Sequence, residues 1–225
     1  MPEKFIQILR KFSTRIRWIT FMHEKFILLE GVYEPREDSF LLALNALKLE
    51  LNKKKVLELG VGSGVISVLC AKRNANVTAI DISEKAVINT IINAHLHNVK
   101  VNVKLGNLFT PVFGERFDII LANLPYLPKL SEIHDDAIFA GQKGNETIIR
   151  SLYFLPFHLK HSGRALYVFS SESRLQEILN TAKKIGLIPI LRDTLEFYDE
   201  NLLCYEFRLS FRSLTCIDKL IYKLI

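Results

Sequence analysis

Cysteine is scarce in this sequence, and no two cysteines are close together. Only Cys70, Cys204 and Cys216 occur among 225 residues, with no Cys-x-x-Cys pair and no Cys/His cluster. This pattern offers neither a disulfide scaffold nor ligands at the usual zinc spacing. Unpaired cysteines are typical of a reducing compartment, so we expect a cytoplasmic protein without a metal site.

Long hydrophobic runs and biased segments are also missing. No apolar run approaches the ~18–20 residues that a membrane span needs, so we expect no membrane partner. Residues 1–17 contain five Lys and Arg residues and no unbroken apolar core, unlike a secretory signal. With 10 Gly and 7 Pro, the composition excludes a collagen-like or low-complexity chain. At 225 residues the chain is long enough to bury a full core as one domain.

Positive charge is in modest excess, because 30 Lys and Arg residues outnumber 24 Asp and Glu residues. A basic surface attracts acidic partners such as RNA, but it often serves solubility alone. Residues 1–30 carry six of the basic residues against three Glu, and we treat them as a basic N-terminal extension. We expect a short amphipathic helix over 5–12 and two strands, at 18–21 and 25–29.

From about residue 38 the sequence alternates between strand and helix patterns. We expect strands at 55–59, 77–80, 100–105, 117–122, 165–170, 187–191 and 203–211, and helices at 38–48, 65–73, 84–97, 146–160 and 174–185. Asp38 or Ser39 is expected to cap the first helix. This alternation favours an α/β fold with a parallel sheet covered by helices, and the last two strands form an antiparallel pair. The domain is predicted over 31–212, with a C-terminal tail at 213–225.

A glycine-rich turn, Gly60-Val-Gly-Ser-Gly64, joins the first of these strands to its helix. Ligands of open α/β sheets bind beyond the carboxyl ends of the strands, where glycines let the backbone approach them. Asp81 ends the next strand, where an acid can accept both hydroxyls of a ribose. Dinucleotide enzymes prefer G-x-G-x-x-G with a pyrophosphate. Here the turn is G-x-G-x-G after Glu58, whose carboxylate repels a pyrophosphate and suits a cationic amino-acid group.

This turn resembles the first motif of class I S-adenosylmethionine-dependent methyltransferases, which implies their Rossmann-like, seven-stranded, mostly parallel sheet with helices on both faces and one antiparallel strand. The resemblance implies that Glu58 and Gly60, with Gly62 in the same turn, hold the amino-acid end of S-adenosylmethionine, and that Asp81 holds its ribose. Asn107 and Leu108 would contact the adenine. Many members have Asp at the first of these positions, but the Asn107 side-chain oxygen can also accept a hydrogen bond.

The fourth strand ends in Asn123-Leu-Pro-Tyr126, which resembles the N-P-P-Y motif of methyltransferases that act on planar nitrogen. An amide nitrogen is a poor nucleophile, because its lone pair is delocalised. Oxygens of Asn123 and Leu124 that accept its two N–H groups can turn the lone pair toward the methyl group, while Tyr126 stacks on the planar group. Leu124 replaces a proline, but the required group is a backbone carbonyl, and Pro125 still favours extended geometry there.

Two further segments narrow the resemblance to HemK-like protein-glutamine methyltransferases, closest to their archaeal and eukaryotic branch. Val32-Tyr-Glu-Pro-Arg-Glu-Asp-Ser39 with the following Phe-Leu-Leu is similar to their Y-x-P-x-E-D-[ST]-x-L-L stretch, and 140–146 to their glycine-rich segment. The resemblance covers about 32–211. It implies that Ser39 contacts the methionine part of the cofactor, with Tyr33 nearby. It also implies that the acceptor is the Gly-Gly-Gln glutamine of a class I peptide-release factor, a protein of translation termination. The enzyme would work with a small zinc-containing activator subunit.

Two other functions remain open from the sequence. An RNA or DNA base amino group (adenine N6 or guanine N2) would use the same cofactor and the same planar-nitrogen motif, and the basic extension would then contact phosphates. A cofactor-binding scaffold without catalysis is the second alternative, which Asn107 and Leu124 favour as departures from the family pattern. The glycine-rich segment at 140–146 is either a lid over the acceptor or an ordinary loop.

Overall fold

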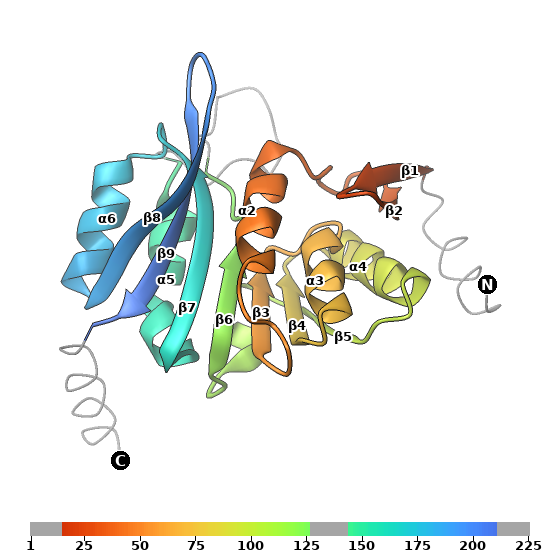
Figure 1. The fold of residues 1–225 in the computed structure, drawn as a ribbon, viewed down its shortest axis with the longest axis horizontal. Coiled ribbons are helices and arrows are strands. Elements are labelled where there is room, and N and C mark those ends of the chain that lie inside the picture. Colours follow the sequence, from red (N-terminus) through yellow and green to blue (C-terminus); the bar gives the residue numbers. More distant parts are fainter. Residues whose placement is uncertain (1–14, 127–143, 211–225) are drawn as a thin grey trace.

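The computed structural model describes residues 15–126 and 144–210, and it places them in a seven-stranded sheet flanked by helices and in a separate two-stranded hairpin (Figure 1). The expected helix over 5–12, the tail at 213–225 and the first part of the segment 140–146 lie outside the described residues. None of the helices in the described ranges is long and apolar enough to cross a membrane.

The large sheet has the strand order β5-β4-β3-β6-β7-β9-β8. Its strands are β3 (Lys55–Leu59), β4 (Asn76–Asp81), β5 (Val101–Leu105), β6 (Phe117–Ala122), β7 (Leu159–Ser170), β8 (Leu187–Glu196) and β9 (Asn201–Leu209). The helices are α2 (Glu37–Leu47), α3 (Val65–Lys72), α4 (Glu84–Leu96), α5 (Glu146–His158) and α6 (Leu175–Lys184), with a short 3₁₀ turn η1 (Thr110–Val112). Strand β9 runs in the opposite direction to the other six strands of this sheet, so the predicted sheet with one antiparallel strand is confirmed.

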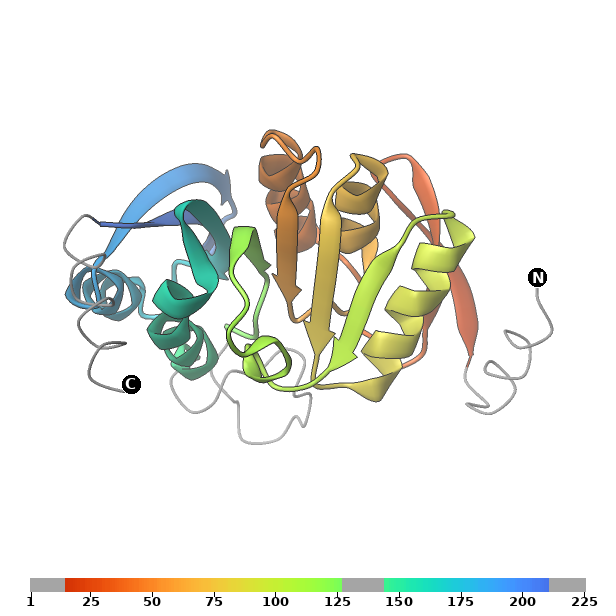
Figure 2. The same ribbon diagram turned by 90° about the horizontal axis from the view of Figure 1, so that it is seen from below.

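The two faces of the sheet are covered by different helices (Figures 1 and 2). Val56, Ile119 and Leu121 face the cluster that includes α2 and α3, whereas Leu57 and Ile120 face the cluster that includes α5 and α6. All five side chains are at most 4% exposed, because β3 and β6 lie in the middle of the sheet and are buried on both faces. A central parallel strand of this kind has a continuous apolar sequence, which explains why these strands could be predicted.

Several predicted boundaries are wrong, and three of the differences bear on the site or the sheet. Helix α2 begins at Glu37 after Arg36, without a side-chain cap, because Asp38 and Ser39 lie in the first turn and bind other partners. Strand β7 begins at Leu159, directly after α5, and is therefore longer than the predicted 165–170. Strand β8 continues to Glu196, beyond the predicted end at 191, because a bulge between Leu191 and Asp193 lets the strand pass through charged residues while it stays paired with β9.

A buried carboxylate ties the antiparallel end of the sheet together. Glu206 on β9 is fully buried and accepts hydrogen bonds from Arg164 on β7 (3.0 Å), Arg192 on β8 (2.8 Å) and Arg208. Burial alone would raise the pKa of Glu206, but the three guanidinium groups outweigh it and hold that pKa below its usual value. A single side chain therefore links three neighbouring strands.

The small hairpin consists of β1 (Ile16–Phe21) and β2 (Glu24–Leu29), close to the strands predicted at 18–21 and 25–29. Two side chains of α4 and the side chain of His97, which directly follows the helix, bind the backbone of β2 at four-residue spacing. Asn89 accepts from the N–H of Leu29 (2.7 Å), Asn93 accepts from the N–H of Ile27 (2.8 Å), and His97 Nε2 lies 3.0 Å from the oxygen of Lys25. We call Asn89, Asn93 and His97 the α4 ladder.

The α4 ladder also reaches the glycine-rich turn. The side-chain amides of Asn89 and Asn93 donate to the backbone oxygen of Ser63, at 3.2 and 2.8 Å, as well as to the oxygen of Ile27. Both asparagines are fully buried. The same two side chains therefore hold the hairpin and the turn after β3, which is the part of the fold that positions the candidate site.

Candidate active site

The glycine-rich turn places an open cradle at the carboxyl end of β3. Gly60, Gly62 and Gly64 all have positive φ, between 55° and 81°, a region that favours glycine. A Cβ on Gly60 would lie 3.2 Å from the Leu124 side chain and 3.4 Å from the backbone oxygen of Asn123. A Cβ on Gly62 would meet nothing within 4 Å, so the space beside this residue is free for a ligand.

Asp81 borders the cradle from the end of the neighbouring strand β4. One carboxylate oxygen accepts from the N–H of Gly62 and the other from the N–H of Ser83, each at 2.9 Å. Burial raises the pKa of Asp81, although these backbone hydrogen bonds act in the opposite direction. A carboxylate has about four acceptor positions, so these backbone contacts leave room for a hydroxyl of a ribose.

Glu58 lies beneath the turn, near the end of β3. Its side chain is 3% exposed and accepts a hydrogen bond from the hydroxyl of Ser67 on α3. Burial, with a smaller contribution from the charge of Asp81, raises the pKa of Glu58 to about 8, although the hydrogen bond from Ser67 acts in the opposite direction. A cationic amino group bound at the turn would therefore favour the ionised form of this carboxyl group.

Asn107 and Leu108 follow β5, on the other side of Asp81. The N–H of Gly106 donates to the backbone oxygen of Asp81 (2.8 Å), which places the two predicted adenine contacts beside the predicted ribose contact. The Asn107 side-chain oxygen accepts from Arg150 on α5 (2.7 Å). This oxygen has a second lone pair, so an adenine amino group can share it. Leu108 has a φ of 51° and packs against the cluster around α5.

The segment Asn123–Tyr126 leaves β6 next to the glycine turn. Leu124 is 4% exposed, and its side chain packs against Gly60. The side-chain amide nitrogen of Asn123 donates to the hydroxyl of Ser39 on α2 (3.4 Å), which leaves the side-chain oxygen of Asn123 without a partner among the described residues. The backbone oxygen of Tyr126 accepts from the hydroxyl of Ser173 (2.9 Å).

Asp38 organises the acceptor side of the site, and the sequence analysis assigned it no role there. Its buried carboxylate accepts from the hydroxyls of Tyr33 (2.8 Å), Tyr126 (3.2 Å) and Ser39 (3.2 Å). Burial and the charge of Asp38 raise the pKa of both tyrosines, so their hydroxyls stay protonated and donate. The signal was present in the sequence, as an acid between Glu37 and Ser39, but a helix cap explained it equally well.

The predicted site residues therefore form two adjoining groups. Glu58, Gly60, Gly62, Asp81, Asn107 and Leu108 surround the carboxyl ends of β3, β4 and β5, whereas Tyr33, Ser39, Asn123, Leu124, Pro125 and Tyr126 lie at the start of α2 and the end of β6. Gly60 joins the two groups, because it contacts both Asn123 and Leu124. The arrangement can hold a nucleoside with a cationic chain beside a planar polar group.

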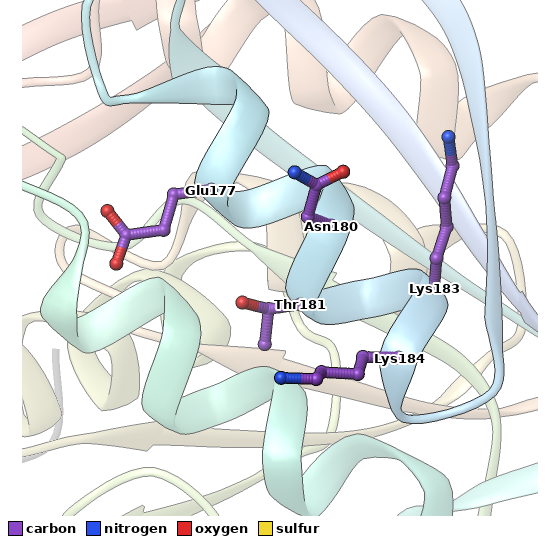
Figure 3. Close-up of a pocket in the computed structure, with 5 residues that line it drawn as sticks. All are labelled: Glu177, Asn180, Thr181, Lys183 and Lys184. Carbon is purple, nitrogen blue, oxygen red and sulfur yellow. The ribbon is translucent and has the colours of Figure 1, made fainter.

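A pocket on α6 lies outside both groups. Figure 3 shows that its five lining residues, Glu177, Asn180, Thr181, Lys183 and Lys184, all come from this one helix. None of them is a predicted site residue. We therefore assign the candidate site to the glycine turn and its surroundings, where the polar groups from several elements converge.

Comparison with known proteins identifies similar sequences with one recurrent description. The profile of the methyltransferase small domain matches residues 37–184. A putative protein N5-glutamine methyltransferase of Methanocaldococcus jannaschii is 40% identical over 161 residues, which cover 69% of this chain and 80% of that protein. Methyltransferase HEMK2 of Homo sapiens is 32% identical over 170 residues, which cover 69% of this chain and 79% of that protein.

Solved structures agree on the fold. The structure of the E. cuniculi Mtq2–Trm112 complex, described as responsible for methylation of the eRF1 translation termination factor, matches with a TM-score of 0.65 at 24% identity, covering 80% of this chain and 99% of that one. The T. thermophilus 16S rRNA N2 G1207 methyltransferase, solved with AdoMet and guanosine, matches with a TM-score of 0.64 at 20% identity, covering 88% of this chain and 50% of that one.

Proposed function

Since the chain belongs to the methyltransferase small-domain family and, within it, to the HemK-like protein-glutamine methyltransferases, we propose that it methylates the Gly-Gly-Gln glutamine of a class I peptide-release factor. The methyl donor is S-adenosylmethionine, and the reaction takes place in the cytoplasm. The observation that carries the proposal is the position of Asn123–Tyr126, directly against the glycine turn at Gly60.

The residues of the cradle fit S-adenosylmethionine. The open space at Gly62, the spare acceptor positions of Asp81 and the buried carboxyl group of Glu58 match a ribose and a cationic amino group. Asn107 and Leu108 lie where the adenine would follow the ribose. When bound, the cofactor supplies an electrophilic methyl group on a positively charged sulfur.

The acceptor side positions the glutamine amide. Asn123 is held by Ser39 through its amide nitrogen, so its oxygen can accept one N–H of the glutamine, and the Leu124 carbonyl can accept the other. The Tyr126 ring, held by Asp38 through its hydroxyl, stacks on the planar amide. These contacts turn the nitrogen lone pair toward the methyl group. The hydroxyl of Tyr126 stays protonated, so it does not act as the base for the proton that the nitrogen loses.

A small activator subunit, zinc-containing as the family resemblance implies, is the proposed partner. Strand β5 is a free edge of the large sheet, and Leu105 at its end is half exposed. Ile82, directly after β4, and Leu96, at the end of α4, are 71% and 39% exposed. An uncovered apolar edge is a template for pairing with a strand of another chain. The similar fold of Mtq2, solved in complex with Trm112, supports this assignment.

Peptide mass spectrometry tests the proposed activity. The protein is incubated with S-adenosylmethionine and a class I release factor, with and without a candidate activator subunit. We expect one added methyl group on the Gly-Gly-Gln glutamine. Asn123→Ala should abolish turnover while keeping cofactor affinity within about threefold, because Asn123 contacts the acceptor amide rather than the cradle. Asn180→Ala, on α6 and remote from the site, is the matched control.

The possible results separate the three functions. An unmodified release factor together with methylated adenine or guanine in RNA would replace the protein acceptor by a base. Cofactor binding without methylation of either substrate, in the presence of the activator, would favour a scaffold. Equal loss of activity in Asn123→Ala and Asn180→Ala would contradict the role of Asn123.

A further inference from the structure

The turn between β8 and β9 carries exposed acidic and aromatic side chains. We call Glu196–Glu200 the hairpin tip. Phe197 and Tyr198 are 46% and 102% exposed, and Glu196 and Asp199 are also exposed. The hairpin tip contains three carboxylates and no basic residue, in a chain whose net charge is +6. Its charge is therefore opposite to that of the whole chain.

The hairpin tip is held close to the acceptor side of the site. Asn201, the first residue after it, donates its N–H to the hydroxyl of Ser171 (3.1 Å), and its oxygen accepts from the N–H of Ser171 (2.8 Å). Two residues later, Ser173 binds the backbone oxygen of Tyr126. The negative charge of Glu200 also contributes to the raised pKa of Tyr126, after burial, Asp38 and Tyr33. Figure 1 shows the connection between β8 and β9 projecting beyond the other strands, at the end of the sheet where α2 begins.

Nothing among the described residues neutralises these carboxylates. Glu196, Asp199 and Glu200 take part in no ion pair there, whereas Glu34, Asp118 and Asp193 each bind a Lys or Arg. The two aromatic rings do not contribute to the hydrophobic core, because both are exposed. Exposed carboxylates next to exposed rings attract cationic side chains, through charge pairing and through cation–π contacts.

We propose that the hairpin tip is a docking surface for a lysine- or arginine-bearing segment of the acceptor protein, next to the glutamine that is methylated. This inference rests on the proposed function and adds a specificity determinant to it. A nucleic acid does not fit the surface, since three carboxylates at the entrance to the site would repel phosphates. The hairpin tip thus favours a protein acceptor over a base.

The test compares two synthetic peptides of about 15 residues that share a central Gly-Gly-Gln and differ only in their flanking residues, lysine in one and serine in the other. For the wild-type protein with its activator, we expect a KM about tenfold lower for the lysine peptide at low salt, with equal kcat. The difference should shrink toward zero at ~0.5 M salt, because screening weakens contacts between exposed charges.

Charge reversal at the hairpin tip should remove this preference. The variant Glu196→Lys/Asp199→Lys should bind both peptides with the same KM, while its KM for the serine peptide stays at the wild-type value. Glu50→Lys/Glu177→Lys changes the net charge equally at exposed positions of other elements and should keep the preference. If the reversed variant does not fold, Glu196→Gln/Asp199→Asn provides the same comparison with a smaller change.

The outcomes distinguish this inference from the proposed function. Equal KM values for both peptides in the wild-type protein, or an unchanged preference in the hairpin-tip variant, would overturn the docking surface and leave the methyltransferase activity intact. Absence of methylation of both peptides and of the release factor itself by the wild-type protein would overturn both.

Discussion

Glu58 is a buried carboxyl group whose pKa of about 8 lies well above the 4.5 of an exposed glutamate. Between these two pH values the unfolded chain has released the proton, while the folded protein without cofactor still holds it. The folded state then binds more protons than the unfolded state, so stability decreases as the pH rises from 4.5 to 8. Below 4.5 both states are protonated, and Glu58 has no effect.

Replacing Glu58 with Gln should therefore stabilise the free protein and weaken cofactor binding. At pH 8 we expect a higher melting temperature than for the wild type, and at pH 4.5 a difference near zero, because glutamine has no charge to bury. Titration calorimetry should show at least about tenfold weaker binding of S-adenosylmethionine, because the cationic amino group loses its anionic partner. A variant that melts at a lower temperature than the wild type at pH 8 would contradict this prediction. It would show that groups around Glu58 already stabilise its ionised form in the free protein.

Asp38 is a single carboxylate that three hydroxyl groups share. Its contacts with Tyr33, Ser39 and Tyr126 join the start of α2 to the segment after β6. None of its hydrogen bonds to the described residues lies in the cradle around Gly62. Asp38 is therefore a positioning residue for the acceptor side, acting through Tyr126 and, by way of Ser39, through Asn123.

The variant Asp38→Asn should separate turnover from cofactor binding. Hydrogen bonds to a charged group are worth about 1.5–3 kcal/mol, so kcat should fall by about tenfold to a hundredfold. The affinity for S-adenosylmethionine should fall less than kcat, because only Tyr33 and Ser39 among the partners of Asp38 are expected near the cofactor. Tyr33→Phe removes only one of the three hydroxyls and should reduce kcat less. Loss of cofactor binding in proportion to kcat would instead indicate a general structural role for Asp38.

At the scale of the element, the α4 ladder does the work of an additional strand. Asn89, Asn93 and His97 pair with the free backbone groups of β2, and the two asparagines also hold Ser63 in the glycine turn. An isolated two-stranded hairpin is marginally stable in water. The hairpin therefore depends on α4, and the turn depends on the same side chains.

Removing one rung of the α4 ladder should affect stability and binding together. Asn93→Ala leaves the buried N–H of Ile27 without its partner, which costs about 1–3 kcal/mol. We expect a lower melting temperature and, because the Ser63 carbonyl also loses a donor, weaker binding of S-adenosylmethionine. Asn102→Ala, at an exposed position on β5, serves as the control and should change neither property. An unchanged affinity for S-adenosylmethionine in Asn93→Ala would show that Asn93 supports the hairpin but not the geometry of the glycine turn.

At the scale of the whole molecule, the cradle collects groups from β3, β4 and β5, so its ligand should stabilise the complete fold. S-adenosylmethionine at 100 times its Kd should add about 2.7 kcal/mol and raise the melting temperature by about 5–10 °C. A dinucleotide such as NAD should give no shift, because Glu58 lies where its pyrophosphate would approach. A thermal scan with both ligands checks this, and an equal shift with NAD would contradict the assignment of the cradle.

The positions of the strands along the chain, and their bounds to within a few residues in most cases, followed from local patterns. The apolar runs of β3 and β6 and the glycine turn each act within a few residues, and they appear where the sequence indicated. Asp38 and the α4 ladder could not be predicted in the same way. Their partners are up to 88 residues away in the chain, and a polar residue on a helix looks the same whether it faces solvent or a buried strand edge.

The same distinction between local and distant contacts explains which parts of the candidate site could be predicted from the sequence. The cradle residues follow the ends of neighbouring parallel strands, and a parallel sheet brings such ends together whatever the loops do. The roles proposed for Asn107 and Leu124 depend on side-chain contacts instead. Only the three-dimensional structure reveals that Arg150 engages the oxygen of Asn107 and that Leu124 packs on Gly60.

The long separation between β2 and α4 has a consequence for the birth of the protein on the ribosome. The hairpin is synthesised before α4, because the residues that anchor it lie 60 to 72 positions later. At a synthesis rate of about 5–20 residues per second, that interval lasts on the order of ten seconds. Throughout it, the apolar side chains of Phe26 and Leu28, buried in the finished protein, have no surface to cover them. The nascent chain therefore exposes this apolar segment until α4 has been made.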